Sequence, residues 1–237
     1  MTHPLYVAFV WHMHQPYYKD SLTGEYRLPW VRLHAVKDYL HMGEVLARYP
    51  TVHQTFNFVP SLIEQLEDYA AGRAVDEHLR LSLAAIRGEL SRADKVWMLR
   101  HFFSIHWDRF IRRYPRYWRL LQIRNQIVQE NQLADADDVD LLGDQYWCDL
   151  AVWFNLAWID PGKVASDPSL AALAEKGKEF SAADLEFVIA RHREMCGQVV
   201  PLYRQLAAAG QIELTTTPYF HPILPLLIDI RAAREAS

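Results

Sequence analysis

The spacing of three strand-like segments is the feature of this sequence that most restricts its fold. The segments lie near residues 5–11, 52–58 and 211–217. The second and third are separated by residues 61–210, about 150 residues whose patterns are mostly helical. Ordinary connections between a strand and the next element span only about 2–6 residues. We therefore expect the helices of 61–210 to form one large insertion that grows out of the edge of a sheet.

The first strand-like segment, Leu5–Trp11, is a continuous apolar and aromatic run. Such a run is typical of a strand buried on both faces, as in parallel sheets. A helical pattern over Val31–Tyr49 and an alternating strand at Thr51–Phe58 follow it. The first sixty residues thus predict a β-loop-α-β unit, and the fold class is α/β with a parallel sheet or barrel.

Helix boundary signals divide the insertion. Ser61 with Glu64 predicts a capping box, and Ser91 with Asp94 repeats the pattern. Pro115 suits the first turn of another helix, because proline lacks the N–H that would have no partner there. Further expectations are a helix to about Ala71, helices over Val96–Phe103, Pro115–Arg124, Leu141–Ala157 and Ser181–Ala209, a kink at Pro201, a loop at Ala134–Asp140 and a terminating Gly210.

Composition excludes several classes of protein. Hydrophobic residues make up 51% of the 237 residues and only 9 are glycine, so a disordered or collagen-like chain is excluded. The 25 basic and 29 acidic residues give a net charge of −4 without basic runs, which predicts no nucleic-acid partner. The longest apolar runs, such as Ile223–Ile228, are far below the roughly 18 residues of a membrane helix.

Two further expectations concern compartment and redox state. Residues Met1–Pro4 lead directly into the first strand-like run without a charged region and cleavage site, so we expect a cytoplasmic protein. The two cysteines, Cys148 and Cys196, match no zinc or redox spacing and lie among apolar neighbours. We expect both to be buried free thiols.

Polar residues follow the first strand directly, at His12 and His14. The carboxyl ends of parallel barrel strands form the active-site face, so these histidines are functional candidates by position. Being two residues apart, they point the same way if the strand continues. They are suited to binding a metal or to hydrogen bonding a polar substrate's hydroxyls, and the alternative is a pair of solvent-facing loop histidines.

The third strand brings a carboxylate to the same region. Glu213 and Thr215 alternate with Ile212 and Leu214, so the two pairs face opposite sides of the sheet. A carboxylate that faces a barrel interior needs a partner, such as a histidine or a substrate hydroxyl. The proline-rich loop that follows places His221 beside the same mouth.

Trp30 is the aromatic side chain that we single out for contact with a ligand. It lies in the long segment after the first strand, and a flat apolar ring with a polar edge suits the C–H face of a sugar. We expect most of the other tryptophans to be core residues, because Trp118 and Trp153 have apolar neighbours at the spacing of a packed stripe.

Three segments together resemble the family 57 glycoside hydrolases, which are retaining α-glucan enzymes. They are His12–Pro16, Asn57–Leu66 and Gly210–Leu226. The helical segments His101–Phe103, Pro115–Trp118 and Trp153–Trp158 resemble the amylopullulanase-like branch of that family. The resemblance runs from Leu5 almost to the last residue.

The resemblance implies that residues 1–237 are the N-terminal part of a catalytic domain, an incomplete (β/α)7 barrel with large helical insertions. His12, His14 and Glu213 would bind the glucose unit being cleaved, with Gln15 and His221 close by. No cofactor and no metal is implied. The family places its nucleophile and acid/base downstream of the matching motifs, so no catalytic residue is expected in this chain and both are expected beyond Ser237.

The leading hypothesis is therefore an α-glucan-active glycoside hydrolase or 4-α-glucanotransferase, an α-amylase-like or amylopullulanase-like enzyme acting on an α-glucan or maltooligosaccharide. A retaining glycosidase needs two carboxyl groups about 5–5.5 Å apart, so this segment alone is expected to be inactive. One alternative is a non-catalytic glucan-binding module. Another is a metal-dependent barrel hydrolase in which His12, His14, His221 and Glu213 hold Zn²⁺.

Overall fold

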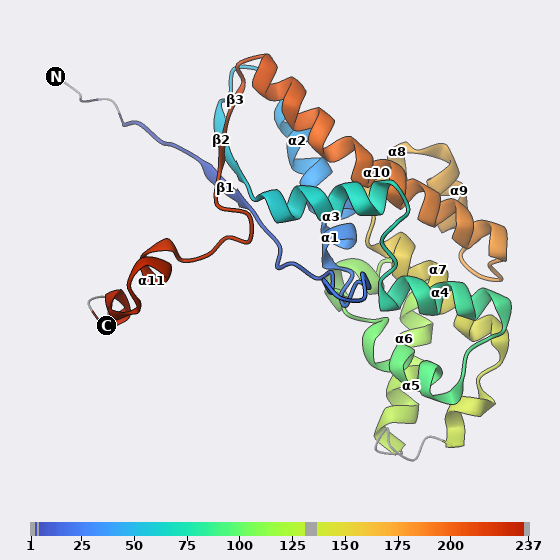
Figure 1. Ribbon diagram of the computed structural model, residues 1–237. Coiled ribbons are helices and arrows are strands. Elements are labelled where there is room, and N and C mark those ends of the chain that lie inside the picture. The colour runs from blue at the N-terminus through green and yellow to red at the C-terminus, as the bar shows by residue number, and fades with distance from the viewer. Residues whose placement is uncertain (1–2, 4, 131–136, 235–237) are drawn as a thin grey trace.

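The fold is a small parallel sheet attached to a large helical region (Figure 1). The computed structural model describes residue 3 and residues 5–130 and 137–234. The three strands are β1 (Val10–Met13), β2 (Gln54–Phe58) and β3 (Ile212–Thr216), paired in that order and parallel throughout. This confirms the α/β class, and parallel strands in chain order are compatible with part of a barrel.

Helices occupy the chain between β2 and β3, as the long helical pattern predicts. Further helical segments lie between β1 and β2 and after β3. The helices and their bounds are α1 (Trp30–His34), η1 (Ala35–Tyr39), α2 (Leu40–Ala47), α3 (Pro60–Ala70), α4 (Glu77–Arg87), α5 (Arg92–His101), η2 (Trp107–Ile111), α6 (Pro115–Glu130), η3 (Asp137–Leu141), α7 (Asp144–Ala157), α8 (Pro161–Ser166), α9 (Pro168–Lys176), α10 (Ala182–Ala208), α11 (Leu224–Ile228) and η4 (Ile230–Arg234).

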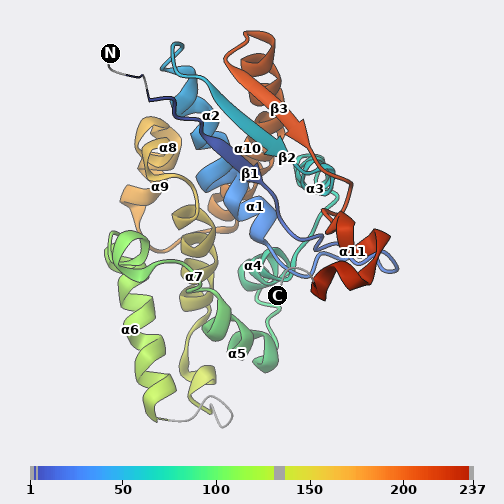
Figure 2. The same ribbon diagram turned by 90° about the vertical axis from the view of Figure 1, so that its left-hand side faces the viewer.

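The helices cover one face of the sheet and leave the other face open. Figure 2 shows the strands in front of α2 and α10, whereas α11, on the viewer's side, lies below the strands and not over them. On the covered face Phe56 and Phe58 are buried, and each ring lies 4.9 Å from the ring of Tyr203 in α10. The alternation of the strands therefore separates an apolar face on the helices from a second face without such a cover.

The first strand is shorter and more exposed than the sequence predicts. It begins at Val10, and Leu5 to Phe9 precede it as an extended, exposed segment. Val10 and Trp11 are also exposed, and only Met13 of β1 is buried. The prediction of a strand at residues 5–11 buried on both faces is thus wrong for this structure. The reason is that β1 pairs with β2 alone, and its outer edge and outer face are not covered within the described residues.

One of the two predicted capping boxes forms. Ser91 and Asp94 bond reciprocally at the start of α5. At α3, by contrast, Pro60 takes the first helical position, Val59 is the N-cap residue and no side chain caps the helix. The Ser61–Glu64 capping box is wrong, because a proline at the first position moves the helix start and frees Glu64 for contacts with tyrosines.

The remaining boundaries follow the sequence closely. Helix α6 begins at Pro115 as predicted and continues to Glu130, and α10 contains Pro201. Gly210 has φ +69°, a left-handed conformation that favours glycine after a helix. Residues 134–136 of the predicted loop lie outside the described residues, and Asp137–Leu141 forms a 3-10 helix.

Helix α7 forms the centre of the helical region. Almost all of its residues from Tyr146 to Ala157 are buried, including Trp147 and Trp153. A helix that is apolar all round belongs in the interior of a protein. Trp153 is therefore a core residue, as the sequence predicts.

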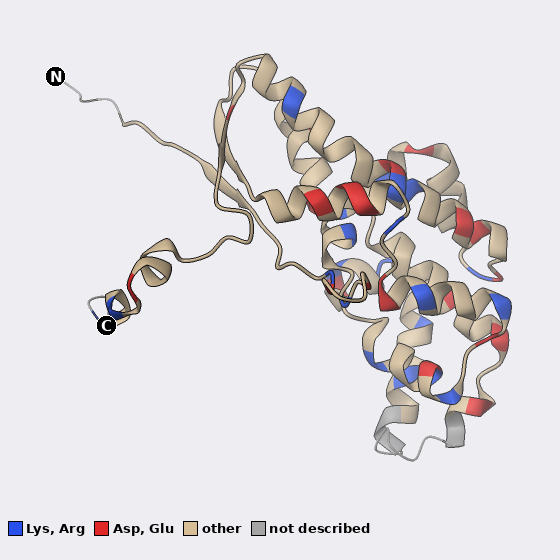
Figure 3. Ribbon diagram, viewed as in Figure 1, with Lys and Arg blue, Asp and Glu red and all other residues tan. Residues whose placement is uncertain are grey.

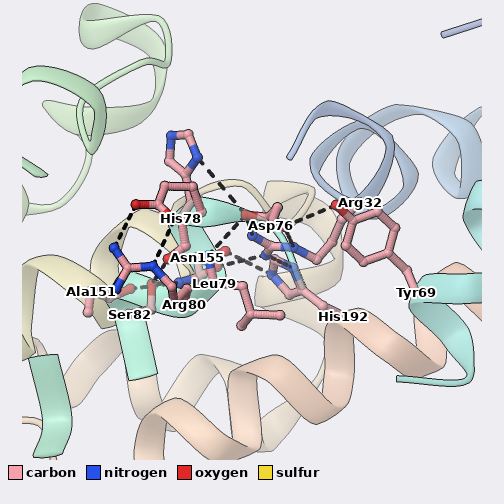
Figure 4. Close-up of polar contacts among 11 residues, drawn as sticks. Arg32, Tyr69, Asp76, His78, Leu79, Arg80, Ser82, Ala151, Asn155 and His192 are labelled. Carbon is pink, nitrogen blue, oxygen red and sulfur yellow. Dashed lines mark hydrogen bonds and ion pairs between the residues drawn. The ribbon is translucent and has the colours of Figure 1, made fainter. Parts of the chain in front are cut away.

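A buried polar network joins the helices behind this core (Figure 4). The Arg32 guanidinium donates to Asp76 at 3.1 Å and to Asn155 at 2.7 Å, and it lies 2.9 Å from Nδ1 of His192. The hydroxyl of Tyr69 and the backbone N–H of Leu79 also donate to the Asp76 carboxylate. Burial by itself raises the pKa of Asp76, but Arg32, together with His78 and the Leu79 N–H, holds that pKa below its usual value. The network ties α1, α3, α4, α7 and α10 together.

Both cysteines are free, as predicted. Cys196 is buried, whereas Cys148 is only half-buried. Across the described part of the chain, no helix combines the length and the apolar character needed to span a bilayer.

Candidate functional site

The open face of the sheet carries a row of polar side chains that are bonded to one another. The register sets His12 beside Asn57 and Asn57 beside Thr215 on adjacent strands. Nδ1 of His12 lies 2.8 Å from Oδ1 of Asn57, and Nδ2 of Asn57 donates to Oγ1 of Thr215 at 3.1 Å. Since Asn57 Oδ1 is an acceptor, His12 carries a proton on Nδ1, which leaves its Nε2 available to a ligand.

Three histidine rings meet at the carboxyl end of this face. The ring of His12 lies 5.3 Å from that of His14 and 4.6 Å from that of His221. The rings of His14 and His221 are stacked at 4.7 Å. The structure therefore brings together the three histidines that the sequence assigns to the mouth. Burial, with smaller contributions from His221 and His12, lowers the pKa of His14, so its imidazole is neutral at pH 7.

Glu213 lies on the same face, two residues earlier along its strand than Thr215. Its carboxylate is exposed and accepts a hydrogen bond of 3.4 Å from the Thr55 hydroxyl. It is the one Asp, Glu, Lys or Arg within the three strands, which Figure 3 draws almost entirely in tan. The sequence predicts a histidine or a substrate hydroxyl as its partner, whereas the partner in the structure is the Thr55 hydroxyl, and the histidine cluster lies further along the face.

Gln15 points away from this cluster of side chains. Its Nε2 donates to the Tyr39 hydroxyl at 3.0 Å, and its Oε1 accepts from the Tyr18 hydroxyl at 3.0 Å. Both ends of the amide are therefore engaged by tyrosines of the protein. This pairing fixes the loop that carries His14, whose carbonyl also accepts from Tyr39.

Trp30 does not join the open face. It begins α1 and lines a separate cavity together with Trp97 and His78. Its ring lies 5.9 Å from that of Trp158 and 6.4 Å from that of His78. The sequence places Trp30 with the histidines of the mouth, but the structure places it beside α4 and α5.

Two groups of residues beside the mouth are not among the sequence candidates. The first is Asn57 and Thr215, which link His12 across the sheet. The alternation of β2 could have identified Asn57, because a polar residue at the strand end shares the face of His12. The second group consists of Glu64, Tyr17 and Tyr219. The Glu64 carboxylate accepts hydrogen bonds from the Tyr17 hydroxyl at 2.7 Å and from the Tyr219 hydroxyl. No sequence pattern links these three residues.

The available chemistry is hydrogen bonding to hydroxyl groups. The open face offers neutral imidazole, an amide, hydroxyls and one carboxylate, which together supply donors and acceptors. Within residues 5–130 and 137–234, no three or more His, Cys, Asp or Glu side chains are arranged to hold a metal ion. The rings of His12, His14 and His221 pack against one another instead.

Comparison with known proteins agrees with the motifs. The sequence model of glycosyl hydrolase family 57 matches residues 8–236, which is nearly the whole chain. No curated protein matches the chain, and no solved structure does so.

Proposed function

Because this chain belongs to glycosyl hydrolase family 57, we propose that the open face of its sheet binds a glucose unit of an α-glucan or maltooligosaccharide. Membership of the family implies glycoside hydrolase or transferase activity on a carbohydrate. In this proposal residues 1–237 are part of a catalytic domain, and β1, β2 and β3 are strands of an incomplete (β/α)7 barrel. The open face then points into the barrel, and such folds bind their substrates at the carboxyl ends of the strands, where the three histidines meet.

The polar row from His12 through Asn57 to Thr215 is the observation that carries the proposal. Its three side chains lie across adjacent strands at hydrogen-bonding distance, so each is held in place before a ligand arrives. Preorganised donors and acceptors reduce the entropy lost on binding. A neutral ligand rich in hydroxyls fits this row, because only Glu213 carries a charge within the strands.

We assign these residues to substrate binding and not to bond cleavage. Retaining hydrolysis or transfer needs two carboxyl groups about 5–5.5 Å apart, one as nucleophile and one as acid and base. Glu213 is the sole carboxylate of the strand residues described above, and its partner is a hydroxyl. In line with the resemblance, the proposal takes both catalytic carboxyl groups from outside residues 1–237. It gives His12, His14, His221 and Glu213 the role of holding the sugar.

Calorimetric titration of the chain with maltoheptaose tests this assignment. We expect Glu213→Gln and His12→Ala each to weaken binding at the open face by about tenfold, since a lost hydrogen bond to a charged group or a positioned ring is worth about 1.5 kcal/mol. Glu186→Gln is the matched control, because Glu186 is exposed on α10, which lies on the covered face of the sheet. Equal affinities for the wild type, Glu213→Gln and His12→Ala would contradict the proposal.

A further inference from the structure

A second cavity, of about 730 Å³, lies between α1, α4 and α5. None of His12, His14, Glu213 or His221 lines it. Its walls combine aromatic rings with polar side chains, and its volume is within the range of about 300–1,000 Å³ of small-molecule sites. The residues used below are Trp30, Asp76, His78, Arg80, Trp97 and His101.

His78 is a buried polar side chain without a partner at this cavity. It is 3% exposed, and neither ring nitrogen makes a well-formed hydrogen bond among the described residues, the backbone of His101 being a weak neighbour that raises the pKa of the ring. Its ring is stacked between Phe102, at 5.4 Å, and Phe154, at 5.0 Å. A buried polar group left without a hydrogen bond destabilises a protein, so the exception calls for an explanation such as a ligand.

The neighbouring Asp76 carboxylate does not form a hydrogen bond with His78. Oδ1 of Asp76 lies 4.0 Å from Nδ1 of His78, outside hydrogen-bonding distance, and the Asp76 carboxylate is occupied by Arg32, Tyr69 and Leu79 (Figure 4). Burial lowers the pKa of His78 to about 4, so the ring is neutral at pH 7 and offers one donor and one acceptor.

Aromatic faces line the cavity on both sides of His78. Trp97 and Trp30 are half-buried, and the Trp97 ring lies 4.8 Å from His78 and 4.2 Å from His101. Partly open indole rings present flat apolar faces with a polar edge, which suits the C–H face of a sugar ring.

Most of the charges around the cavity are already paired, and Glu25 at the rim is the lining residue for which the described residues provide no ion pair. Arg80 donates to Glu77 at 2.6 Å and to Asp94 at 2.8 Å. Asp76 is paired with Arg32, and Arg27 at the rim is paired with Asp20 at 2.9 Å. An anion would have to compete with the carboxylates that already pair with Arg80 and Arg27, so the cavity favours a neutral ligand over an anion.

We propose that this cavity is a second carbohydrate site, in which a neutral sugar unit stacks on Trp97 and Trp30 and hydrogen bonds to His78. The site is separate from the open face of the sheet. The choice of an α-glucan as its ligand rests on the proposed function. A chain with two such sites can hold one glucan strand at two places, which raises the effective concentration of the second contact.

The test is calorimetric titration with maltoheptaose, the probe used for the open face. We expect two binding events in the wild type. Trp97→Ala should weaken the cavity event at least tenfold, and Trp97→Phe should retain most of it because an aromatic face remains. Trp107→Ala is the matched control, since Trp107 is 42% exposed and does not line the cavity.

His78→Phe separates a binding role from a structural one. Phenylalanine can keep the stacking between Phe102 and Phe154 while it removes the two unpartnered nitrogens, so we expect the melting temperature of the free chain to be retained or raised. Sugar binding at the cavity should nevertheless weaken at least tenfold. Lost stability together with unchanged binding would overturn the assignment of His78.

These variants test the cavity proposal and the open-face proposal independently. If Trp97→Ala and His78→Phe bind as the wild type does while His12→Ala does not, the cavity proposal is overturned and the open-face proposal stands. If Trp97→Ala removes binding while His12→Ala and Glu213→Gln leave it unchanged, the open-face proposal is overturned and the cavity stands. Absence of any binding to wild type overturns both.

Discussion

Arg32 and Asp76 form an ion pair 3.1 Å apart in which both side chains are almost completely removed from solvent. Arg32 lies two residues after Trp30, and Asp76 lies two residues before His78. The pair therefore sets the distance between the start of α1 and the start of α4, which are two walls of the proposed sugar cavity. Asn155 and His192 complete the coordination of the guanidinium from α7 and α10.

Arg32→Met should strongly destabilise the protein. Removal of one partner leaves Asp76 as a buried charge without compensation, and such losses are about 3–5 kcal/mol in the free energy of unfolding. Urea denaturation monitored by circular dichroism measures the change. Arg27→Met is the control, because solvent screens the Arg27–Asp20 pair at the surface and its loss should change stability far less. If the two variants lost similar amounts of unfolding free energy, the buried Arg32–Asp76 pair would contribute no more to stability than the surface pair.

The stabilisation from this pair should vanish in acid. The pKa of Asp76 is below its usual 3.8 in the folded protein, so the unfolded chain binds the proton first as the pH falls. The contribution is therefore complete above about pH 3.8 and is lost as the pH falls through the folded-state pKa. The stability difference between wild type and Asp76→Asn should shrink on acidification below pH 3.8, and a constant difference would contradict the shifted pKa.

Two buried histidines should make the fold sensitive to mild acid. Burial lowers the pKa of His78 to about 4 and, together with Arg32, that of His192 to about 3, against 6.5 in an unfolded chain. As the pH falls from 6.5 to about 4, the unfolded state gains protons that the folded state does not, so stability decreases by about 1.4 kcal/mol per pH unit for each histidine. Urea denaturation across this range gives the slope of the unfolding free energy against pH. In His78→Phe that slope should correspond to about one proton fewer than in the wild type. An unchanged slope in that variant would contradict the lowered pKa of His78.

The pKa of His14 should depend on its histidine neighbours. Burial first, and then His221 and His12, lower the pKa of His14. Removing the neighbour in His221→Ala should therefore raise the His14 pKa toward 6.5, which an NMR titration of the ring protons measures. His106→Ala, at the N-cap of η2 and outside the cluster, should leave the His14 curve in place. If the His14 pKa is the same with and without His221, the rings do not interact as described.

Cys196 should resist alkylation until the protein unfolds. Burial raises the pKa of its thiol to about 12, and the thiolate is the reactive form. Cys148 is half-buried and should react with iodoacetamide before Cys196, although burial also raises its pKa. Mass spectrometry of Cys148→Ser and Cys196→Ser separates the two rates. Rapid labelling of Cys148→Ser under native conditions would be inconsistent with a closed core.

Local pattern was sufficient for much of the fold. The strands at 52–58 and 211–217 and the helical stretch between them appear close to their predicted bounds, because periods of 2 and 3.6 residues are properties of the backbone itself. The Ser91–Asp94 cap is equally local, since its partners are three residues apart. The Ser61–Glu64 cap failed where a neighbouring proline and two distant tyrosines competed for the same groups.

The candidate site also contains residues whose location the sequence predicted and residues whose location it did not predict. Alternation along the strand and the order of the motifs identified His12, His14 and His221, and their rings do meet. Gln15 was implied by the resemblance and Trp30 was chosen by its position in the chain, and the surroundings of both differ from the mouth. Whether a polar amide faces a ligand or a tyrosine depends on which helix packs behind it, and a linear pattern does not contain that information.

The amino-acid sequence by itself determined the parallel α/β class, the long helical region within it, the alternation that presents His12 and Glu213 on one side of the sheet, and the family. Only the tertiary structure decided that Arg32 meets Asp76, that Asn57 links His12 to Thr215, and that Trp30 and His78 share a cavity. The physical reason is range. Backbone periodicity acts over a few residues, whereas these contacts join segments more than 40 residues apart, and they exist only after the helices have packed against one another and against the sheet.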